Sequence, residues 1–346
     1  MKKQFILIVA LFLMVGMNAG AAVIDSIYYN LTHVYEAEVA RDSTNTFSYS
    51  GDIVIPDTVY YKGVAYRVVT VGNSAFAGCE KLNSVTLPSS VQSINNAAFS
   101  KCTHLSRVTM GDNITAIGDN AFAGCTLLMG LKLPASLKKI GYRAFADCAS
   151  LTVLTIPDGV TSIGQSAFRK CTDLRSVTLP KRLTMIDNDM FRECTALEQI
   201  NIPQQVTTIN PNAFRGCTSL KNISFGSKLV TVDDNAFRDC VALTAIELLD
   251  NINKVGVGAF QGCKKLKTIT LGSAIESLFA SAFGECTSLT DVFMQSDNIP
   301  KTDQNLFLGS SLTNATLHCR PALMEIYQKA KPWSDFSKHD SIAPVQ

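Results

Sequence analysis

Charge is scarce in this sequence, and neither sign dominates. Only 17% of the 346 residues are Asp, Glu, Lys or Arg, and the formal net charge is +2. Lys2 and Lys3 lie in a segment that we expect to be removed; without them Lys+Arg falls from 31 to 29, equal to the 29 Asp+Glu. Because no run of like charge is present, nothing indicates binding to nucleic acid or to a membrane surface by charge alone.

Long apolar runs are missing beyond the N-terminus. The apolar run from Phe5 to Val15 is too short to span a bilayer comfortably; Lys2 and Lys3 precede it and the small residues Asn18 to Ala22 follow. This arrangement predicts a signal peptide over residues 1–22, with an uncleaved anchor as the alternative. We expect an exported protein, secreted or on the cell surface, with the periplasm as a further option. No later stretch predicts membrane insertion after cleavage.

Motifs for catalysis and cofactor binding are also missing. The chain has no G-x-S-x-G, no H-E-x-x-H and no C-x-x-C, and none of its four histidines stands beside a repeated acid. His104 falls at a variable position and is expected to face solvent. The glycine-rich stretch 256–262 resembles a phosphate loop, but its last glycine is one place late and the repeat below explains it. We therefore predict no enzyme activity, no cofactor and no metal site.

What the sequence does have is a strict internal repeat. A Phe stands three residues before each of ten cysteines, from Phe76 to Phe283, and a period this regular indicates a solenoid. The cysteines are spaced 23 residues apart, at Cys79, Cys102, Cys125, Cys148, Cys171, Cys194, Cys217, Cys240, Cys263 and Cys286.

Each repeat follows one pattern, C-x-x-L-x-x-V-x-L-P-x-x-V-x-x-I-x-x-x-A-F-x-x. The V-x-L portion has period two, which predicts a short strand with one face inward, and the Pro ends or limits it. A single 23-residue unit cannot bury enough apolar surface to fold alone. Neighbouring units must therefore stack their strands and share a continuous core.

A turn is expected seven residues before each cysteine, where Gly, Asn or Asp predominates. These residue types adopt positive φ most readily, so we predict a left-handed position there. Phe279 occupies the position in the last full repeat, and we expect that turn to differ. The other members are Gly72, Asn95, Gly118, Gly141, Gly164, Asp187, Asn210, Asp233 and Gly256.

Both ends of the array carry different sequence, as the caps of a solenoid must. Residues 23–75 contain alternating strand-like runs and predict a β-rich N-terminal cap with a possible hairpin around Lys62-Gly63. The repeat proper covers residues 76–298. Residues 299–336 predict a C-terminal cap with a strand at 315–317 and a helix at 321–330 that buries Leu323, Ile326 and Tyr327; Trp333 and Phe336 close the end. Residues 337–346 are predicted to be a frayed tail.

The cysteines suggest disulfides at first, because exported proteins rich in cysteine are often cross-linked. Their spacing argues otherwise. Equivalent side chains in adjacent coils point in parallel, whereas a disulfide needs two Cβ atoms turned toward each other. We therefore predict a ladder of buried, reduced thiols that act as small hydrophobic residues. Cys319 lies outside the register and is the one expected to differ.

The motifs A-F-x-x-C and L-x-x-V-x-L-P resemble the BspA-like, or Treponema-type, leucine-rich repeats of bacterial secreted and cell-surface proteins. The resemblance covers about residues 52–336, and the strings 49–56 and 333–336 look like the family's ends. It implies a leucine-rich-repeat solenoid, a right-handed coil with short parallel strands on its concave face. It also implies binding to host matrix or plasma proteins, or to another bacterial surface.

The residues that flank the inward Val of each strand are expected to face outward and to carry any specificity. This row is polar and rich in Thr, with no row of aromatics, so a protein partner is favoured and a glycan is the second choice. Thr also suits exposed strands for structural reasons alone, which leaves a structural or periplasmic scaffold as the alternative function. The candidate binding residues are Arg107, Thr109, Lys132, Thr155, Thr178, Gln199, Asn201, Asn222, Ser224, Glu247 and Thr270.

Overall fold

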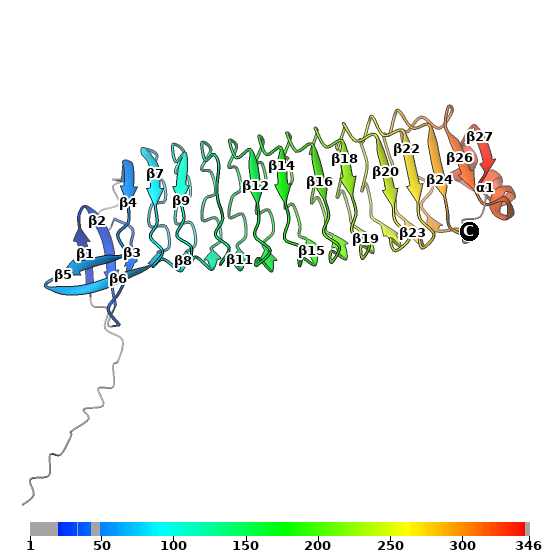
Figure 1. The fold of residues 1–346 in the computed structure, drawn as a ribbon. Coiled ribbons are helices and arrows are strands. Elements are labelled where there is room, and N and C mark those ends of the chain that lie inside the picture. Colours follow the sequence, from blue (N-terminus) through cyan, green and yellow to red (C-terminus); the bar gives the residue numbers. More distant parts are fainter. Residues whose placement is uncertain (1–19, 33, 43–48, 343–346) are drawn as a thin grey trace, which may run out of the picture.

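The protein is an elongated solenoid of stacked coils with a β-rich cap at its N-terminal end and a helical cap at its C-terminal end (Figure 1). A computed structural model describes residues 20–32, 34–42 and 49–342. Most of the expected signal peptide lies outside the described residues. Its last part, residues 20–22, belongs to the first strand of the N-terminal cap.

The V-x-L segments form a parallel ladder along one side of the array, which we call the strand face (Figure 1). Neighbouring strands are offset by one repeat, so that Leu154 pairs with Val177 and Ile200 with Ile223. The strands are β4 (Gly51–Val54), β7 (Leu82–Thr86), β9 (Arg107–Thr109), β12 (Val153–Thr155), β14 (Ser176–Thr178), β16 (Gln199–Asn201), β18 (Asn222–Ser224), β20 (Ala245–Leu248), β22 (Thr268–Leu271), β24 (Asp291–Met294), β26 (Thr316–Cys319) and β27 (Lys338–Ser341).

This ladder is interrupted, contrary to the expectation of a strand in every coil. The sheet β4-β7-β9 ends before the coil that contains residues 130–132, and β12 begins the next sheet. The strand ladder also divides between β14 and β16 and between β18 and β20, although every coil there has its strand. Gly130 has φ +37°, which is incompatible with an extended strand at the position where other coils start one. The residue type at a single outward position therefore removes one strand from the ladder.

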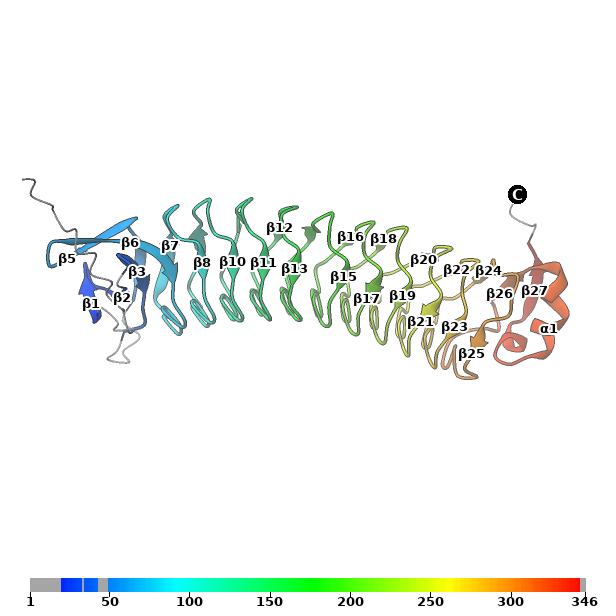
Figure 2. The same cartoon turned by 90° about the horizontal axis from the view of Figure 1, so that it is seen from below.

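A second parallel ladder joins the coils on another side, at the Ile of the repeat pattern (Figure 2). We predicted these apolar residues to point into the core, and the structure places them there on two-residue strands as far as Leu278; the last strand of the ladder has Thr302 at that position. Those strands are β8 (Ser93–Ile94), β10 (Ala116–Ile117), β11 (Lys139–Ile140), β13 (Ser162–Ile163), β15 (Met185–Ile186), β17 (Thr208–Ile209), β19 (Thr231–Val232), β21 (Lys254–Val255), β23 (Ser277–Leu278) and β25 (Lys301–Thr302).

The A-F-x-x-C segments form a third connection between coils, which we call the turn edge. Its main-chain amides bond the next coil: Phe168 N–H donates to Met190 O at 3.0 Å and Lys170 N–H to Arg192 O at 2.8 Å. The left-handed residues stand one and five places before each cysteine, as in Lys170 (φ 60°) and Ser166 (φ 57°). The turn is therefore left-handed at two positions that the sequence did not reveal.

The prediction of a left-handed residue seven places before each cysteine is wrong. None of the residues assigned to it has positive φ: Gly72, Asn95, Gly118, Gly141, Gly164, Asp187, Asn210, Asp233 and Gly256. Glycine is favoured there because coils approach closely; a Cβ on Gly141 would lie 2.6 Å from the main-chain nitrogen of Asp119. Phe279 does not differ in the expected way, since its N–H bonds Val255 O just as the N–H of Gly256 bonds Val232 O.

The core consists of stacked rows of identical side chains. The phenylalanines from Phe76 to Phe307 form one continuous stack with 5.0–5.8 Å between neighbouring ring centroids. Beside it, all eleven cysteines, Cys319 included, are buried free thiols. From Cys102 to Cys286, each thiol donates to the carbonyl of the preceding coil's phenylalanine at 3.0–3.5 Å.

The N-terminal cap is a small sheet that continues into the array. Strands β1 and β2 and strands β2 and β3 pair antiparallel, and β5 and β6 form the hairpin expected around Lys62-Gly63. Strand β6 then pairs parallel with β8 and so joins the second ladder. Tyr49 packs on Phe76 at 4.8 Å and closes the phenylalanine stack. The remaining bounds are β1 (Gly20–Ile24), β2 (Ile27–Leu31), β3 (Glu36–Val39), β5 (Thr58–Tyr61) and β6 (Val64–Val71).

The C-terminal cap comprises η1 (Pro321–Leu323), α1 (Met324–Lys329) and η2 (Trp333–Asp335). Trp333 and Phe336 meet the ring of Phe307 edge-on, at 5.7 and 5.3 Å, and close the stack as predicted. Ile326 is 46% exposed rather than buried. Residues 338–341 were expected to fray but form β27 beside β26. No helix in the described ranges is long and apolar enough to cross a membrane.

Candidate binding surface on the strand face

The predicted binding residues lie together on the strand face. Their side chains alternate with buried ones along each strand, as in the exposed, buried, exposed pattern of β9, β12 and β16. Ten of them are exposed and Thr270 is half-buried. Lys132 lies in the coil that has no strand on this face. The set is Arg107, Thr109, Lys132, Thr155, Thr178, Gln199, Asn201, Asn222, Ser224, Glu247 and Thr270.

Three of these residues line a hollow on the strand face. Thr178, Asn201 and Ser224 come from β14, β16 and β18 and border a space of about 730 Å³. Its remaining polar walls are the side chains of residues just beyond the strands, among them Lys181 and Gln204. Sequence reasoning placed the three strand residues in one column but did not indicate that the surface is hollowed beside them.

Hydrogen bonds between adjacent coils fix the side chains around this hollow. The hydroxyl of Ser224 donates to Asn201 Oδ1 at 2.7 Å. Between the same two coils, just beyond the strands, Ser227 donates to Gln204 at 2.9 Å and Lys228 to Gln205 at 2.8 Å. These contacts hold the polar groups in place before any ligand arrives, which reduces the entropy lost on binding.

Phe225 adds an aromatic side chain to the hollow. It stands where other coils have a smaller Leu, Ile or Met, and it is only partly buried, packed edge-on against Phe237 at 6.1 Å. The sequence contained the signal, since this is the only Phe at that position of the repeat. The hollow therefore combines amides and hydroxyls with one accessible apolar ring.

A second hollow of about 570 Å³ lies beside the interruption in the ladder. Lys132 and Thr155 line it together with Asp112 and the exposed side chain of Val153. Two of the predicted residues are thus brought together at the coil that lacks a strand. Five of the eleven predicted residues line these two hollows. The others lie on the open surface around and beyond them: Arg107, Thr109, Gln199, Asn222, Glu247 and Thr270.

The C-terminal part of the strand face carries a contact that the sequence did not indicate. His318 Nε2 lies 2.9 Å from Asp291 Oδ1, and the imidazole stacks on Phe293 with 4.3 Å between ring centroids. The hydrogen bond from His318 holds the pKa of Asp291 below its usual range. The 23-residue register does not reveal this pair, because the last repeats are lengthened and His318 follows Asp291 by 27 residues.

The strand face offers groups for hydrogen bonding and few for proton transfer or metal binding. Across the described residues, no group of three or more His, Cys, Asp or Glu could hold a metal ion. His104 is exposed and bonds only its neighbour Thr103. The groups that this surface presents are amides, hydroxyls and isolated charges.

Comparison with known families decides the classification. The model of the BspA-type leucine-rich-repeat region, in six copies, matches residues 64–152, 138–248 and 207–330. The chain belongs to this family. The resemblance inferred from the A-F-x-x-C motif is confirmed, and so is the solenoid of 23-residue turns. No curated protein matches the sequence.

Solved structures of bacterial proteins, two of them described as leucine-rich, share the fold. A leucine-rich-repeat protein from Bacteroides ovatus is 28% identical, with a TM-score of 0.55, covering 93% of this chain and 100% of its own. A leucine-rich cell surface protein from Faecalibacterium prausnitzii is 26% identical, with a TM-score of 0.59 and coverage of 94% and 95%. The pneumococcal vaccine antigen PcpA, at 19% identity, a TM-score of 0.52 and coverage of 96% and 100%, shows likeness of fold alone.

Proposed function

We propose that this bacterial leucine-rich-repeat protein is exported and binds a macromolecular partner, most simply a protein, along its strand face. The observation that carries the proposal is the row of outward polar side chains from Arg107 to Thr270, which follows the stacked strands and is hollowed at two places. Solenoids use such extended faces for binding because each coil contributes one strip of a continuous surface.

The composition of the face supports a protein partner. Its charges are few and of both signs, with Arg107 and Lys132 toward one end and Glu247 toward the other. A partner would therefore be recognised by shape and hydrogen bonds more than by long-range attraction. Exposed Val153 and half-buried Phe225 supply apolar surface whose burial would favour association.

Export and the class of partner rest on the expected signal peptide and on the relatives. The F. prausnitzii relative is described as a cell surface protein, which supports an extracellular or surface location for this chain. Candidate partners are a host matrix or plasma protein, or another bacterial surface, with a glycan as the second class. The alternative function is a structural or periplasmic scaffold with no external partner.

The test replaces the strand face while leaving the core intact. The variant Lys132→Ala, Asn201→Ala, Ser224→Ala and Glu247→Ala removes one positive and one negative charge, and all four side chains are exposed. The wild-type protein is first tested against a panel of immobilised matrix and plasma proteins and against bacterial cells. For any partner that it binds, the affinity of the variant should be at least tenfold lower. Unchanged binding would show that the strand face is not the site.

A matched control carries the same number of alanine substitutions on the second ladder and directly beside it. The substitutions Lys139→Ala, Ser162→Ala, Thr207→Ala and Glu276→Ala also remove exposed side chains and one charge of each sign. This variant should bind like the wild type. Protease treatment of intact cells separates the two functions: digestion from outside supports the surface protein, and full protection supports the periplasmic scaffold.

A further inference from the structure

The larger hollow on the strand face, the one bordered by Thr178, Asn201 and Ser224, is called the donor hollow below. Its side-chain amides have their oxygens occupied. Asn201 Oδ1 accepts the hydroxyl of Ser224 at 2.7 Å, and Gln204 Oε1 accepts the hydroxyl of Ser227 at 2.9 Å. Within the described parts of the chain the NH2 groups of both amides have no acceptor, and each NH2 offers two donors. The border therefore presents nitrogen to a ligand and keeps oxygen for the next coil.

The amide of Gln205 can be oriented in only one way. Its Oε1 lies 2.8 Å from Nζ of Lys228, and a lysine ammonium donates hydrogen bonds but never accepts them. The oxygen must therefore face Lys228, and the NH2 group remains available at the border of the hollow. The donor character of this border thus follows from the chemistry of the lysine beside it.

Three cations lie at or beside these amides. Lys181 lines the hollow, and Arg182 and Lys228 occupy the position of Gln205 in the preceding and the following coil. Lys181 is paired with Asp158, at 3.2 Å. In the ranges that the structure describes, no ion pair joins Arg182 or Lys228 to a carboxylate. Positive charge without a counter-ion therefore stands in the coils on both sides of one amide.

The acids of the neighbouring coils are engaged elsewhere. Asp158 accepts the main-chain N–H of Lys181 at 3.0 Å as well as its ammonium, and these bonds hold the pKa of Asp158 below its usual range. On the other side, Asp250 accepts the N–H and the hydroxyl of Ser273, at 2.7 and 2.9 Å. Glu247 lies one coil further along and is not part of the lining. Among the described residues the lining contains no acid, so a carboxylate of a ligand would meet donors without a competitor.

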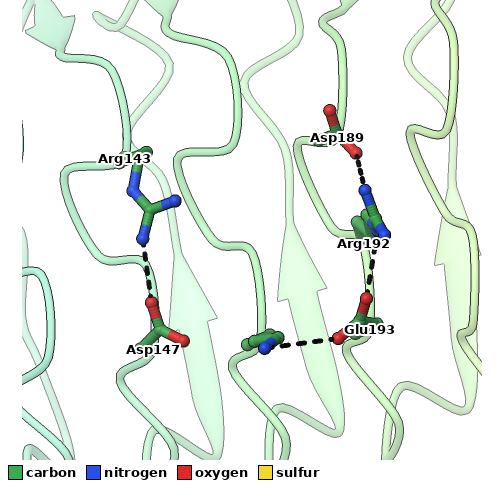
Figure 3. Close-up of polar contacts among 6 residues, drawn as sticks. Arg143, Asp147, Asp189, Arg192 and Glu193 are labelled. Carbon is green, nitrogen blue, oxygen red and sulfur yellow. Dashed lines mark hydrogen bonds and ion pairs between the residues drawn. The ribbon is translucent and has the colours of Figure 1, made fainter.

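The turn edge shows the opposite arrangement, in which cations have acids beside them. Arg143 lies 3.1 Å from Asp147 (Figure 3). Arg192 lies between Asp189, at 3.2 Å, and Glu193, at 3.1 Å (Figure 3). The charge of these arginines is balanced within the chain and needs no ligand. The donor hollow differs because its border has donors and cations but no acid of its own.

The floor of the donor hollow is apolar. Val177, Leu179 and Ile202 are buried and line it, and the partly buried ring of Phe225 stands beside them. A space of about 730 Å³ has the size of pockets that enclose organic ligands, and a single inorganic anion would not fill it. An aliphatic floor fits an apolar side chain, whereas a sugar ring carries hydroxyl groups on most of its carbons. The hollow therefore favours a peptide over a glycan.

We propose that the donor hollow holds an extended segment of the protein partner. An aspartate or glutamate of that segment meets the amides of Gln204 and Gln205, and an apolar side chain lies against Phe225. The proposal rests on the strand-face function given above and adds the chemistry that the partner must present. A carboxylate offers only acceptors, and its hydrogen bonds to NH2 and ammonium donors are stronger than those between neutral groups. Because bonds between coils already hold the donors, little side-chain entropy is lost on binding.

The experiment uses the full chain and synthetic peptides, so it does not require the partner to be known. Wild-type protein is applied to an immobilised library of heptapeptides in which each position is varied. It should retain peptides that carry Asp or Glu within three residues of Leu, Ile or Phe. The best of these should bind at least tenfold more tightly than the same peptide with Asn or Gln in place of the acid.

The variant Gln204→Glu with Gln205→Glu exchanges two donors for two carboxylates of the same shape. Its affinity for the acidic peptides should be at least tenfold lower. The matched control, Gln92→Glu with Gln165→Glu, adds the same charge at exposed glutamines outside the hollow and should change the affinity less than threefold. An unchanged midpoint of thermal unfolding confirms that both variants are folded.

Three outcomes would overturn the proposal. They are retention of peptides without an excess of acids, an equal loss of affinity in both variants, and stronger competition by polygalacturonate than by an acidic peptide at equal carboxylate concentration. The last result would assign the hollow to an acidic glycan.

This inference and the strand-face function fail separately. If the peptides show no preference for acids while the four-site strand-face variant loses a macromolecular partner, this inference alone is wrong. If acidic peptides depend on Gln204 and Gln205 while no macromolecule depends on the strand face, the chemistry of the hollow is confirmed and the proposed function is wrong.

Discussion

The thiol of Cys194 donates a hydrogen bond to the main-chain carbonyl of Phe168 in the preceding coil, at 3.1 Å. The same carbonyl accepts the N–H of Cys171, in its own coil, at 3.2 Å. One phenylalanine carbonyl therefore joins two coils, and this arrangement repeats along the array. The cysteine is more than a small apolar side chain, because its S–H is one of the groups that hold adjacent coils in register.

This relationship predicts an order of stability among substitutions of Cys194. Cys194→Ala removes the donor and leaves a small cavity, and we expect a loss of about 1–2 kcal/mol. Cys194→Ser keeps a donor and should cost less. Ser310 already occupies the cysteine position at the end of the array and donates to Phe283 O at 2.6 Å. Thermal unfolding would compare the two, and a larger loss for serine would mean that sulfur acts only as apolar filling.

Burial of the thiols also predicts a loss of stability at alkaline pH. Burial raises the pKa of Cys217 and of Cys286 from 9.0 to about 12. Between pH 9 and about 12 the unfolded chain loses these protons and the folded chain keeps them, so stability falls as pH rises. The thermal midpoint should decline more steeply across this range than in Cys217→Ser with Cys286→Ser. Parallel curves would contradict the linkage.

The number of reactive thiols tests the reduced state directly. All eleven cysteines are buried and unpaired in the structure. An aromatic disulfide reagent at pH 8 should therefore label few thiols in the native protein and about eleven after denaturation without reductant. Fewer than about eight in the denatured sample would indicate that some of the thiols are oxidised, because a reduced ladder leaves every one of them free to react.

The phenylalanine stack predicts a large effect of truncation in its centre. Phe191 is fully buried with rings 5.4 Å away on either side. Phe191→Ala should destabilise the protein by about 3–5 kcal/mol, because neither neighbour can collapse into the space. Phe279 is 40% exposed, and Phe279→Ala should cost much less. Similar losses of thermal midpoint for the two variants would argue against a rigid stack.

Close approach of the coils predicts that Gly141 cannot carry a side chain. A Cβ there would lie 2.6 Å from Asp119 N, so Gly141→Ala should cost about 1–3 kcal/mol through overpacking. Gly130 is the comparison, because nothing lies within 4 Å of a Cβ at that position. Gly130→Asn should be nearly neutral, since Asn tolerates positive φ. The midpoint of thermal unfolding should therefore be clearly lower for Gly141→Ala than for Gly130→Asn. An unchanged midpoint for Gly141→Ala would show that the coils can move apart.

The features that could be predicted from the sequence are those that recur in every repeat. Ten copies of Phe-x-x-Cys gave the period, and the alternation around Val177 or Ile200 gave the outward and inward faces. The inward rows are buried and most of the outward row is exposed, because strand geometry leaves no other arrangement.

The left-handed positions could not be predicted because two physical causes select the same residue. Glycine at 141 reflects a close approach between coils, whereas glycine at 216 reflects φ +75°. Arg143 and Lys170 adopt positive φ without being glycine, since hydrogen bonds from neighbouring coils hold the turn. Residue type alone does not separate these cases.

The shape of the candidate site could not be predicted from the sequence either. Sequence placed Thr178, Asn201 and Ser224 in one outward column, but the hollow beside them depends on residues beyond the strands and on the size of Phe225. The contact between Asp291 and His318 arises where the repeat length changes. A 23-residue pattern does not predict contacts between side chains where the repeat length changes.

The thiols, the amides of the turn edge and the stacked phenylalanine rings each join one coil to its immediate neighbour. Any coil therefore presents on its two sides nearly the same surfaces as the coil before it. A segment of 23 residues could be deleted or duplicated within the array and the flanking coils would still meet matching partners. The length of the molecule is thus open to change by unequal recombination, and so is the distance between its two caps.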